Sequence, residues 1–136
     1  MKKIVETPLH IKLEIKEGLE IKLINEPEYF LDSLNGIREK VHIRHILNKP
    51  VDLIHLFTRS KKELWVEFAG LKRFMKKNGV LWISWPDKSS HIVSDLDENA
   101  VKDIGFKNGL VDVKSCSIDN NWRALKFIFQ PEVFAK

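Results

Sequence analysis

Two short and nearly continuous apolar runs constrain the fold of this chain more than any other feature. They cover residues 51–57 and 80–85, and such runs are typical of strands buried on both faces of a parallel sheet. An alternating strand pattern precedes them at residues 19–24, with Leu19, Ile21 and Leu23 on one face. Helical patterns lie between these segments. Strands that alternate with helices predict an α/β, Rossmann-like domain, in which helices flank a mostly parallel sheet.

Three helices are predicted from their start signals. The clearest begins at a capping box, Ser60 to Glu63, and extends over residues 60–77. An earlier helix is expected after Asn25, which is a good N-cap residue, and is expected to stop at Gly36. A third is predicted from residue 94, where acidic side chains favour a first helical turn. An apolar stripe predicts which face of the clearest helix is buried. It consists of Leu64, Phe68, Leu71 and Met75.

The remaining segments complete the expected sheet. Residues 40–47 favour a short strand, and residues 110–118 and 123–129 alternate around a turn at 119–121. The last two segments predict an antiparallel hairpin at the edge of the sheet. With 136 residues, the chain is expected to form a single domain over residues 1–136. Residues 1–13 carry no clear structure signal, and two alternatives stay open for them: they wrap around the domain, or they fray as a loosely held tail.

Composition excludes several classes of protein. One cysteine, Cys116, allows neither an intrachain disulfide nor a zinc cluster of thiolates. His42 and His45 would point to opposite faces of a strand, so no metal site is expected. The sequence holds no apolar run long enough to cross a membrane, and residues 1–7 lack the apolar core of a signal peptide. We therefore expect a soluble, cytoplasmic protein, and its net charge of +4 permits contact with a polyanion without requiring it.

The carboxyl ends of the predicted parallel strands indicate where a ligand would bind. In open α/β sheets, ligands bind beyond these ends. Here they bring together amide, hydroxyl and ammonium donors beside an aromatic side chain, a mixture suited to a small anion or to the carboxylate of a protein partner. The predicted ligand-binding residues are Asn25, Ser84, Trp85, Lys88 and Ser89. The alternative is that Asn25 and Ser84 only cap helices and turns.

A basic helix gives a second interpretation. The predicted helix 60–77 carries six cations on an arc opposite its apolar stripe, and a polyanion could lie along them. These residues are Lys61, Lys62, Lys72, Arg73, Lys76 and Lys77. A solvated amphipathic helix has such a face as well. A nucleic-acid-associated module therefore stays an alternative to a domain that binds a small molecule.

Four segments, in order, resemble a family of short bacterial proteins of unknown function. These proteins have a truncated fold similar to class I S-adenosylmethionine-dependent methyltransferases. The segments cover residues 25–27, 85–90, 94–98 and 122–127, and read Asn-Glu-Pro, Trp-Pro-Asp-Lys-Ser-Ser, Ser-Asp-Leu-Asp-Glu and Trp-Arg-Ala-Leu-Lys-Phe. Residues 71–86 also resemble a strand segment of those methyltransferases. The resemblance implies a fold without implying an activity. Glu26 and Asp87 depart from the family pattern and add negative charge.

The first turn argues against a methyltransferase cofactor. Such a cofactor needs a glycine-rich turn after the first strand, where the backbone approaches the ligand closely. Residues 25–28 hold no glycine, lack an N–H at Pro27 and carry Glu26 and Glu28. We therefore expect a non-catalytic domain without a bound cofactor. An S-adenosylmethionine-dependent methyltransferase or another small-molecule enzyme stays the alternative.

Overall fold

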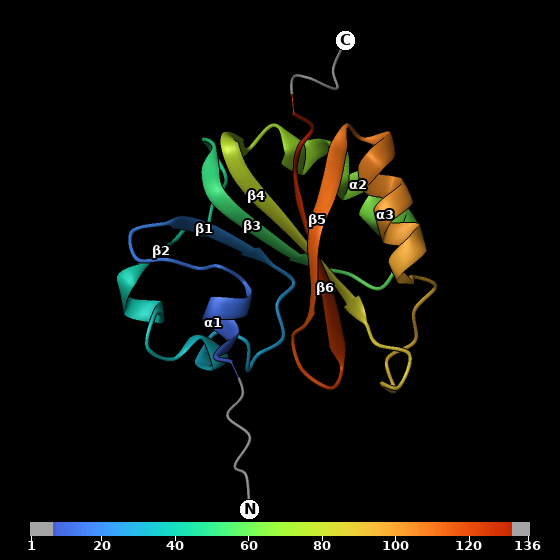
Figure 1. Ribbon diagram of the computed structural model, residues 1–136, viewed down its shortest axis with the longest axis horizontal. Coiled ribbons are helices and arrows are strands. Elements are labelled where there is room, and N and C mark those ends of the chain that lie inside the picture. Colours follow the sequence, from blue (N-terminus) through green and yellow to red (C-terminus); the bar gives the residue numbers. More distant parts are fainter. Residues whose placement is uncertain (1–6, 132–136) are drawn as a thin grey trace, which may run out of the picture.

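The computed structural model describes residues 7–131 and shows one six-stranded sheet with helices on both faces (Figure 1). The strands are β1 (Glu20–Ile24), β2 (His42–Ile43), β3 (Val51–Phe57), β4 (Met75–Pro86), β5 (Leu110–Ser117) and β6 (Trp122–Phe129). The helices are α1 (Leu9–Lys12), α2 (Lys61–Lys72) and α3 (Glu98–Lys107), and two 3₁₀ turns follow β1 at Asp32–Leu34 and Arg38–Lys40. No helix among residues 7–131 is long and apolar enough to cross a membrane.

The strand order is β2-β1-β3-β4-β6-β5. Strands β2, β1, β3 and β4 run parallel to one another, whereas β6 pairs antiparallel with both β4 and β5. This arrangement confirms the α/β prediction, including the antiparallel hairpin at the C-terminal end of the sequence. Because β1 and β3 are adjacent and parallel, residues that follow them emerge at the same edge of the sheet.

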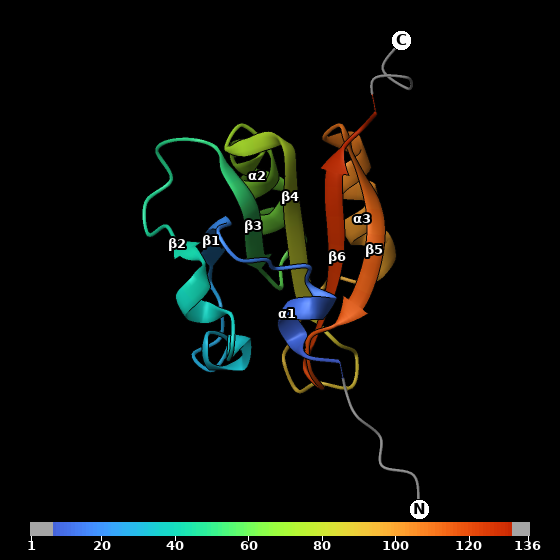
Figure 2. The same cartoon turned by 60° about the vertical axis from the view of Figure 1, so that its left-hand side comes forward.

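Each face of the sheet has its own apolar core. Helices α2 and α3 cover one face, while α1 and the segment after β1 cover the other (Figures 1 and 2). The first core includes Phe68 of α2 packed edge-on against Phe127 of β6. The second includes Phe30 and the ring of Trp82, which donates a hydrogen bond to the Leu13 carbonyl over 3.1 Å. The segment up to Leu13 is thus packed from Leu9 onward rather than being a loose tail. Residues 1–6 of the expected tail lie outside the described residues.

Helix α2 starts where it was predicted and ends early. The Ser60 hydroxyl accepts a hydrogen bond from the Glu63 N–H at 3.1 Å, which confirms the cap. The stripe residues are all buried, yet Met75 begins β4, because the helix stops at Lys72. Trp65 is 50% exposed. It lies one residue after Leu64, which places it about 100° away from the buried stripe.

The helix expected after Asn25 does not form. Asn25 has a φ of 58°, whereas an N-cap residue needs extended backbone. The following residues make turns and the two 3₁₀ segments, although Phe30, Leu34 and Ile37 are buried with helix-like spacing. The expected strand over residues 40–47 is reduced to the two residues of β2. This irregular segment nevertheless seals one face of the sheet.

Gly105 in α3 provides a test of the packing between α3 and β6. A Cβ at this position would lie 2.1 Å from the Phe127 ring, which is fully buried and held by Phe68. Gly→Ala in a helix normally stabilises by about 1 kcal/mol. Here we expect Gly105→Ala to lower the free energy of unfolding by about 1–3 kcal/mol, because the ring has no room to move. Urea denaturation measures this change. Gly70→Ala in α2, where nothing lies within 4 Å, is the matched control, and equal effects at the two positions would contradict the described packing.

Candidate functional site

A cavity opens at the carboxyl ends of β1 and β3. We call it the strand-end cavity, and its volume is about 480 Å³. In the strand order, β2, the strand that follows β1 in the chain, lies on one side of the β1–β3 pair, and β4, which follows β3, lies on the other side. Open α/β sheets bind ligands at such a position. The residues that line it come from four separate segments: Asn25, Phe57, Thr58, Arg59, Glu63, Ile92 and Trp122. The sequence placed only Asn25 of these among the predicted ligand-binding residues.

Asn25 gives the turn after β1 an unusual backbone shape. Its φ of 58° lies in the left-handed region, which asparagine adopts more readily than most residues with a side chain. A glycine commonly supplies this conformation. The absence of glycine from residues 25–28 therefore does not prevent a tight left-handed turn. The exposed Asn25 amide lines the cavity from this turn.

Two opposite charges face the cavity without pairing with each other. Arg59 follows β3 directly, and Glu63 lies in the first turn of α2. Among the described residues, neither side chain has an ion pair or a side-chain hydrogen bond. Both side chains are exposed to solvent. The cavity thus offers one guanidinium and one carboxylate to a ligand.

Aromatic rings form the apolar part of the cavity. Phe57 and Trp122 meet edge to face, with ring centroids 5.2 Å apart. Tyr29, from the segment after β1, interacts with Asp119, Asn121 and Trp122. Burial raises the pKa of the Tyr29 hydroxyl, and the Asp119 carboxylate raises it further. Tyr29 therefore places the segment after β1 next to the residues between β5 and β6.

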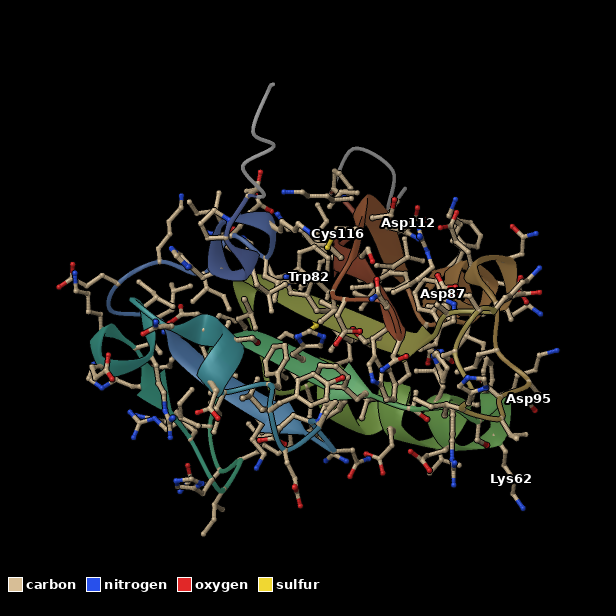
Figure 3. All side chains as sticks on the ribbon, turned by 90° about the horizontal axis from the view of Figure 1, so that it is seen from below. Lys62, Trp82, Asp87, Asp95, Asp112 and Cys116 are labelled. Carbon is tan, nitrogen blue, oxygen red and sulfur yellow. The ribbon has the colours of Figure 1, made fainter. Side chains whose placement is uncertain are left out.

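The loop of residues 87–97 forms the outer wall. Its far end is tied to Arg59, whose carbonyl accepts hydrogen bonds from the Ser94 hydroxyl at 2.8 Å and from the Asp95 N–H at 3.3 Å. The Asp95 carboxylate also accepts from the N–H of Lys61 at the start of α2. Figure 3 shows Asp87 and Asp95 near the two ends of this loop, with Asp95 on the side of Lys62. Ile92 of the same loop lines the strand-end cavity.

The structure distributes the five predicted ligand-binding residues over different environments. Asn25 lines the strand-end cavity, whereas Trp85 and Lys88 line a neighbouring cavity of about 410 Å³ with Asp97, Glu98 and Arg123. Ser89 turns back and donates its hydroxyl to the Asp87 carboxylate at 2.8 Å. Hydrogen bonds from the Ser89 N–H and hydroxyl hold the pKa of Asp87 below its usual range. Ser84 is fully buried and faces the core.

Ser84 is paired with His55, which lies in the middle of β3. The Nε2 of His55 lies 2.7 Å from the Ser84 hydroxyl, and both side chains are fully buried. Phe57 stacks on the His55 ring at 4.3 Å, and Phe30 meets it edge-on. Among buried side chains of the described residues, only His55 Nδ1 lacks a hydrogen-bond partner. Burial lowers the pKa of His55 to about 3, so the ring is neutral at physiological pH.

The six basic residues do not form one helical face. Lys61, Lys62 and Lys72 belong to α2, Arg73 caps it, and Lys76 and Lys77 lie on β4. The Lys76 ammonium pairs with Asp52 at 3.1 Å and with Glu20 at 3.3 Å. The Lys72 ammonium donates to the Asn108 carbonyl. The predicted basic helix over residues 60–77 is therefore wrong in extent, because the chain changes from helix to strand after Lys72.

No group of three metal-ligating side chains occurs within residues 7–131. Cys116 lies half-buried on β5, and burial raises the pKa of its thiol. A thiol in this state is a poor nucleophile, because the reactive form is the thiolate. The strand-end cavity combines charged groups that have no partner among the described residues with polar groups and apolar walls.

Comparison with family models gives no match, and comparison with curated proteins gives none. Solved structures match well in fold. Magnesium protoporphyrin IX methyltransferase from Synechocystis PCC 6803 with bound SAH is 11% identical, with a TM-score of 0.60 over 84% of this chain and 75% of that chain. A SAM dependent methyltransferase from Aquifex aeolicus is 14% identical, with a TM-score of 0.61 over 88% of both chains. A ribosomal protein L11 methylase from Lactobacillus delbrueckii subsp. bulgaricus is 10% identical, with a TM-score of 0.61 over 90% of this chain and 77% of that chain. The chain therefore has the Rossmann-like fold of class I S-adenosylmethionine-dependent methyltransferases.

Proposed function

We propose that this chain is a ligand-binding domain that holds a small organic molecule in the strand-end cavity. The observation that carries this proposal is that the cavity lies at the switch point of a methyltransferase-like sheet and is lined by aromatic rings, a guanidinium and a carboxylate, of which the two charged groups have no partner among the described residues. Unpaired charges next to apolar surface are typical of small-molecule sites. A chemical reaction is not part of this proposal.

S-adenosylmethionine is the cofactor that the fold implies, and the structure gives arguments on both sides. The left-handed turn at Asn25 fits a close approach of a ligand to the backbone. However, Pro27 offers no N–H in the following turn, and Glu26 and Glu28 add negative charge. The short strand β2 is followed by residues 44–49, which include no acidic side chain that could hold the ribose hydroxyls. The donor set therefore does not fit the adenosyl part of this cofactor.

A methyltransferase is the second candidate function, favoured by the fold of the structural neighbours that bind SAM or SAH. The two candidates differ in one measurable property. An S-adenosylmethionine-dependent enzyme would bind S-adenosylmethionine or S-adenosylhomocysteine with micromolar affinity. The proposed ligand-binding domain would bind neither at that level, because its β1 turn and β2 end lack the required groups. Isothermal titration calorimetry with both compounds separates these candidates.

The location of binding is tested by filling the cavity. Titration of ¹⁵N-labelled protein with a panel of amino acids, nucleotides, S-adenosylmethionine and S-adenosylhomocysteine should shift the amide signals of Asn25, Arg59 and the Trp122 indole. We expect Ile92→Trp to weaken the binding of any responsive compound by at least about tenfold, since the added ring occupies the cavity. Val93→Trp adds the same bulk at the next residue, which is 83% exposed and outside the cavity lining, and should leave affinity unchanged. A panel without any response at these residues would contradict the proposal.

A further inference from the structure

The charges of the strand-end cavity indicate the chemical class of its ligand. We infer that the cavity binds a zwitterionic amino acid with an apolar side chain. This inference rests on the proposed function, since it names the ligand of the same cavity. It follows from three features of the lining, namely the Arg59 guanidinium, the Glu63 carboxylate and the apolar surface of Phe57, Ile92 and Trp122.

The Arg59 guanidinium would bind the carboxylate of the ligand. Arg59 has no side-chain partner among the described residues, and its backbone is fixed because its carbonyl holds Ser94 and Asp95. A guanidinium offers parallel N–H donors that match a carboxylate in a bidentate pair. The amide of Asn25 and the hydroxyl of Thr58 lie in the same lining and add neutral hydrogen-bonding groups. A ligand carboxylate would thus meet a charged donor that no other group of residues 7–131 already occupies.

The Glu63 carboxylate would bind the ammonium group of the ligand. Glu63 lies four residues after Arg59, and its backbone N–H is held by the Ser60 cap, so the side chain projects from a defined helical turn. Arg59 and Glu63 lie more than 4.0 Å apart at their charged atoms, because no ion pair joins them. A ligand that carries one positive and one negative group neutralises both. A simple anion would leave Glu63 unpaired beside it, and a simple cation would leave Arg59 unpaired.

The apolar walls of the cavity favour a ligand whose own side chain is apolar. Phe57 is buried and Trp122 half-buried, and their rings meet edge to face. Ile92, from the loop of residues 87–97, lines the same cavity. Aromatic and aliphatic side chains gain free energy on such surfaces in proportion to the apolar area that they bury. Among amino acids, phenylalanine combines the two charged groups with an apolar ring and is therefore the probe of choice.

The experiment uses three related probes on the full chain. L-phenylalanine carries both charges, phenethylamine lacks the carboxylate, and 3-phenylpropanoate lacks the ammonium group. Calorimetry is expected to show that L-phenylalanine binds at least about tenfold more tightly than either analogue. Arg59→Gln should weaken L-phenylalanine by about tenfold and leave phenethylamine unchanged. Glu63→Gln should weaken L-phenylalanine similarly and leave 3-phenylpropanoate unchanged. Lys62→Gln, an exposed neighbour of Glu63, is the control and should change none of these affinities.

The outcomes separate this inference from the proposed function. Tighter binding of S-adenosylhomocysteine than of L-phenylalanine would overturn the inference and leave a small-molecule site in place, because that compound adds an adenosyl group to the same zwitterionic end. Binding of L-phenylalanine that is insensitive to both Arg59→Gln and Glu63→Gln would also overturn it. A failure of every probe, S-adenosylhomocysteine included, would overturn the inference and the proposed function together.

Discussion

Phe68→Ala is expected to lower the free energy of unfolding by about 3–5 kcal/mol. Phe68 is fully buried between α2 and the sheet, and its ring meets Phe127 of β6 edge to face at 5.4 Å. Truncation removes this contact and leaves a cavity that neighbouring strands cannot close, because packed interiors relax only in part. Urea denaturation monitored by tryptophan fluorescence gives the value.

Val66→Ala is the matched control for this prediction. Val66 lies two residues earlier on the same helix and is 65% exposed. Its truncation removes little buried surface, so the change in stability should stay within about 0.5 kcal/mol. If the two substitutions cost the same, α2 would not pack on the sheet through Phe68, and the described orientation of the helix would be wrong.

The second large effect is a loss of stability in acid that depends on His55. Burial lowers the pKa of His55 to about 3, well below the value near 6.5 of an exposed histidine. The unfolded chain therefore takes up the proton first as the pH falls. The contribution of His55 is fully present above about pH 6.5 and is lost toward pH 3, by about 1.4 kcal/mol per pH unit.

Denaturation of the wild type and two variants at pH 7, 6, 5 and 4 measures this effect. His55→Leu should be less stable at pH 7, because the buried Ser84 hydroxyl loses its partner. It should also lose stability less steeply between pH 6 and pH 4 than the wild type. His91→Gln, at an exposed position, should keep the wild-type pH dependence. Identical slopes for wild type and His55→Leu would mean that His55 is not buried as a neutral ring.

Sequence patterns predicted the sheet better than the connections. The apolar runs at residues 51–57 and 80–85 form central strands. A short run of this kind is typical of a strand that is buried on both faces of a parallel sheet. The Ser60 N-cap was also a local signal that the structure confirms, because the Ser60 hydroxyl accepts a hydrogen bond from the Glu63 N–H. The segment after Asn25 was predicted wrongly, because its helical spacing reflects packing of Phe30 and Leu34 on the sheet rather than a continuous helix.

The candidate site was predictable in location and less so in composition. Open α/β sheets bind ligands beyond the carboxyl ends of their strands. That rule predicted Asn25, and it would also have predicted Arg59, which lies just after β3. Ser84 was chosen as a polar strand-end residue, but strand alternation places it on the same face as Trp82 and next to His55. Ile92 and Trp122 come from a loop and a distant strand, and only the folded sheet brings them to Asn25. No local sequence pattern predicts that Ile92 and Trp122 lie close to Asn25.

A crystal structure grown with L-phenylalanine tests the central claim most directly. The account predicts ligand density in the strand-end cavity, with the carboxylate on Arg59, the ammonium group near Glu63 and the ring against Phe57 and Trp122. Density for the ligand beside Trp85 and Lys88 in the neighbouring cavity would contradict it. So would an empty strand-end cavity at a ligand concentration that saturates the protein in calorimetry.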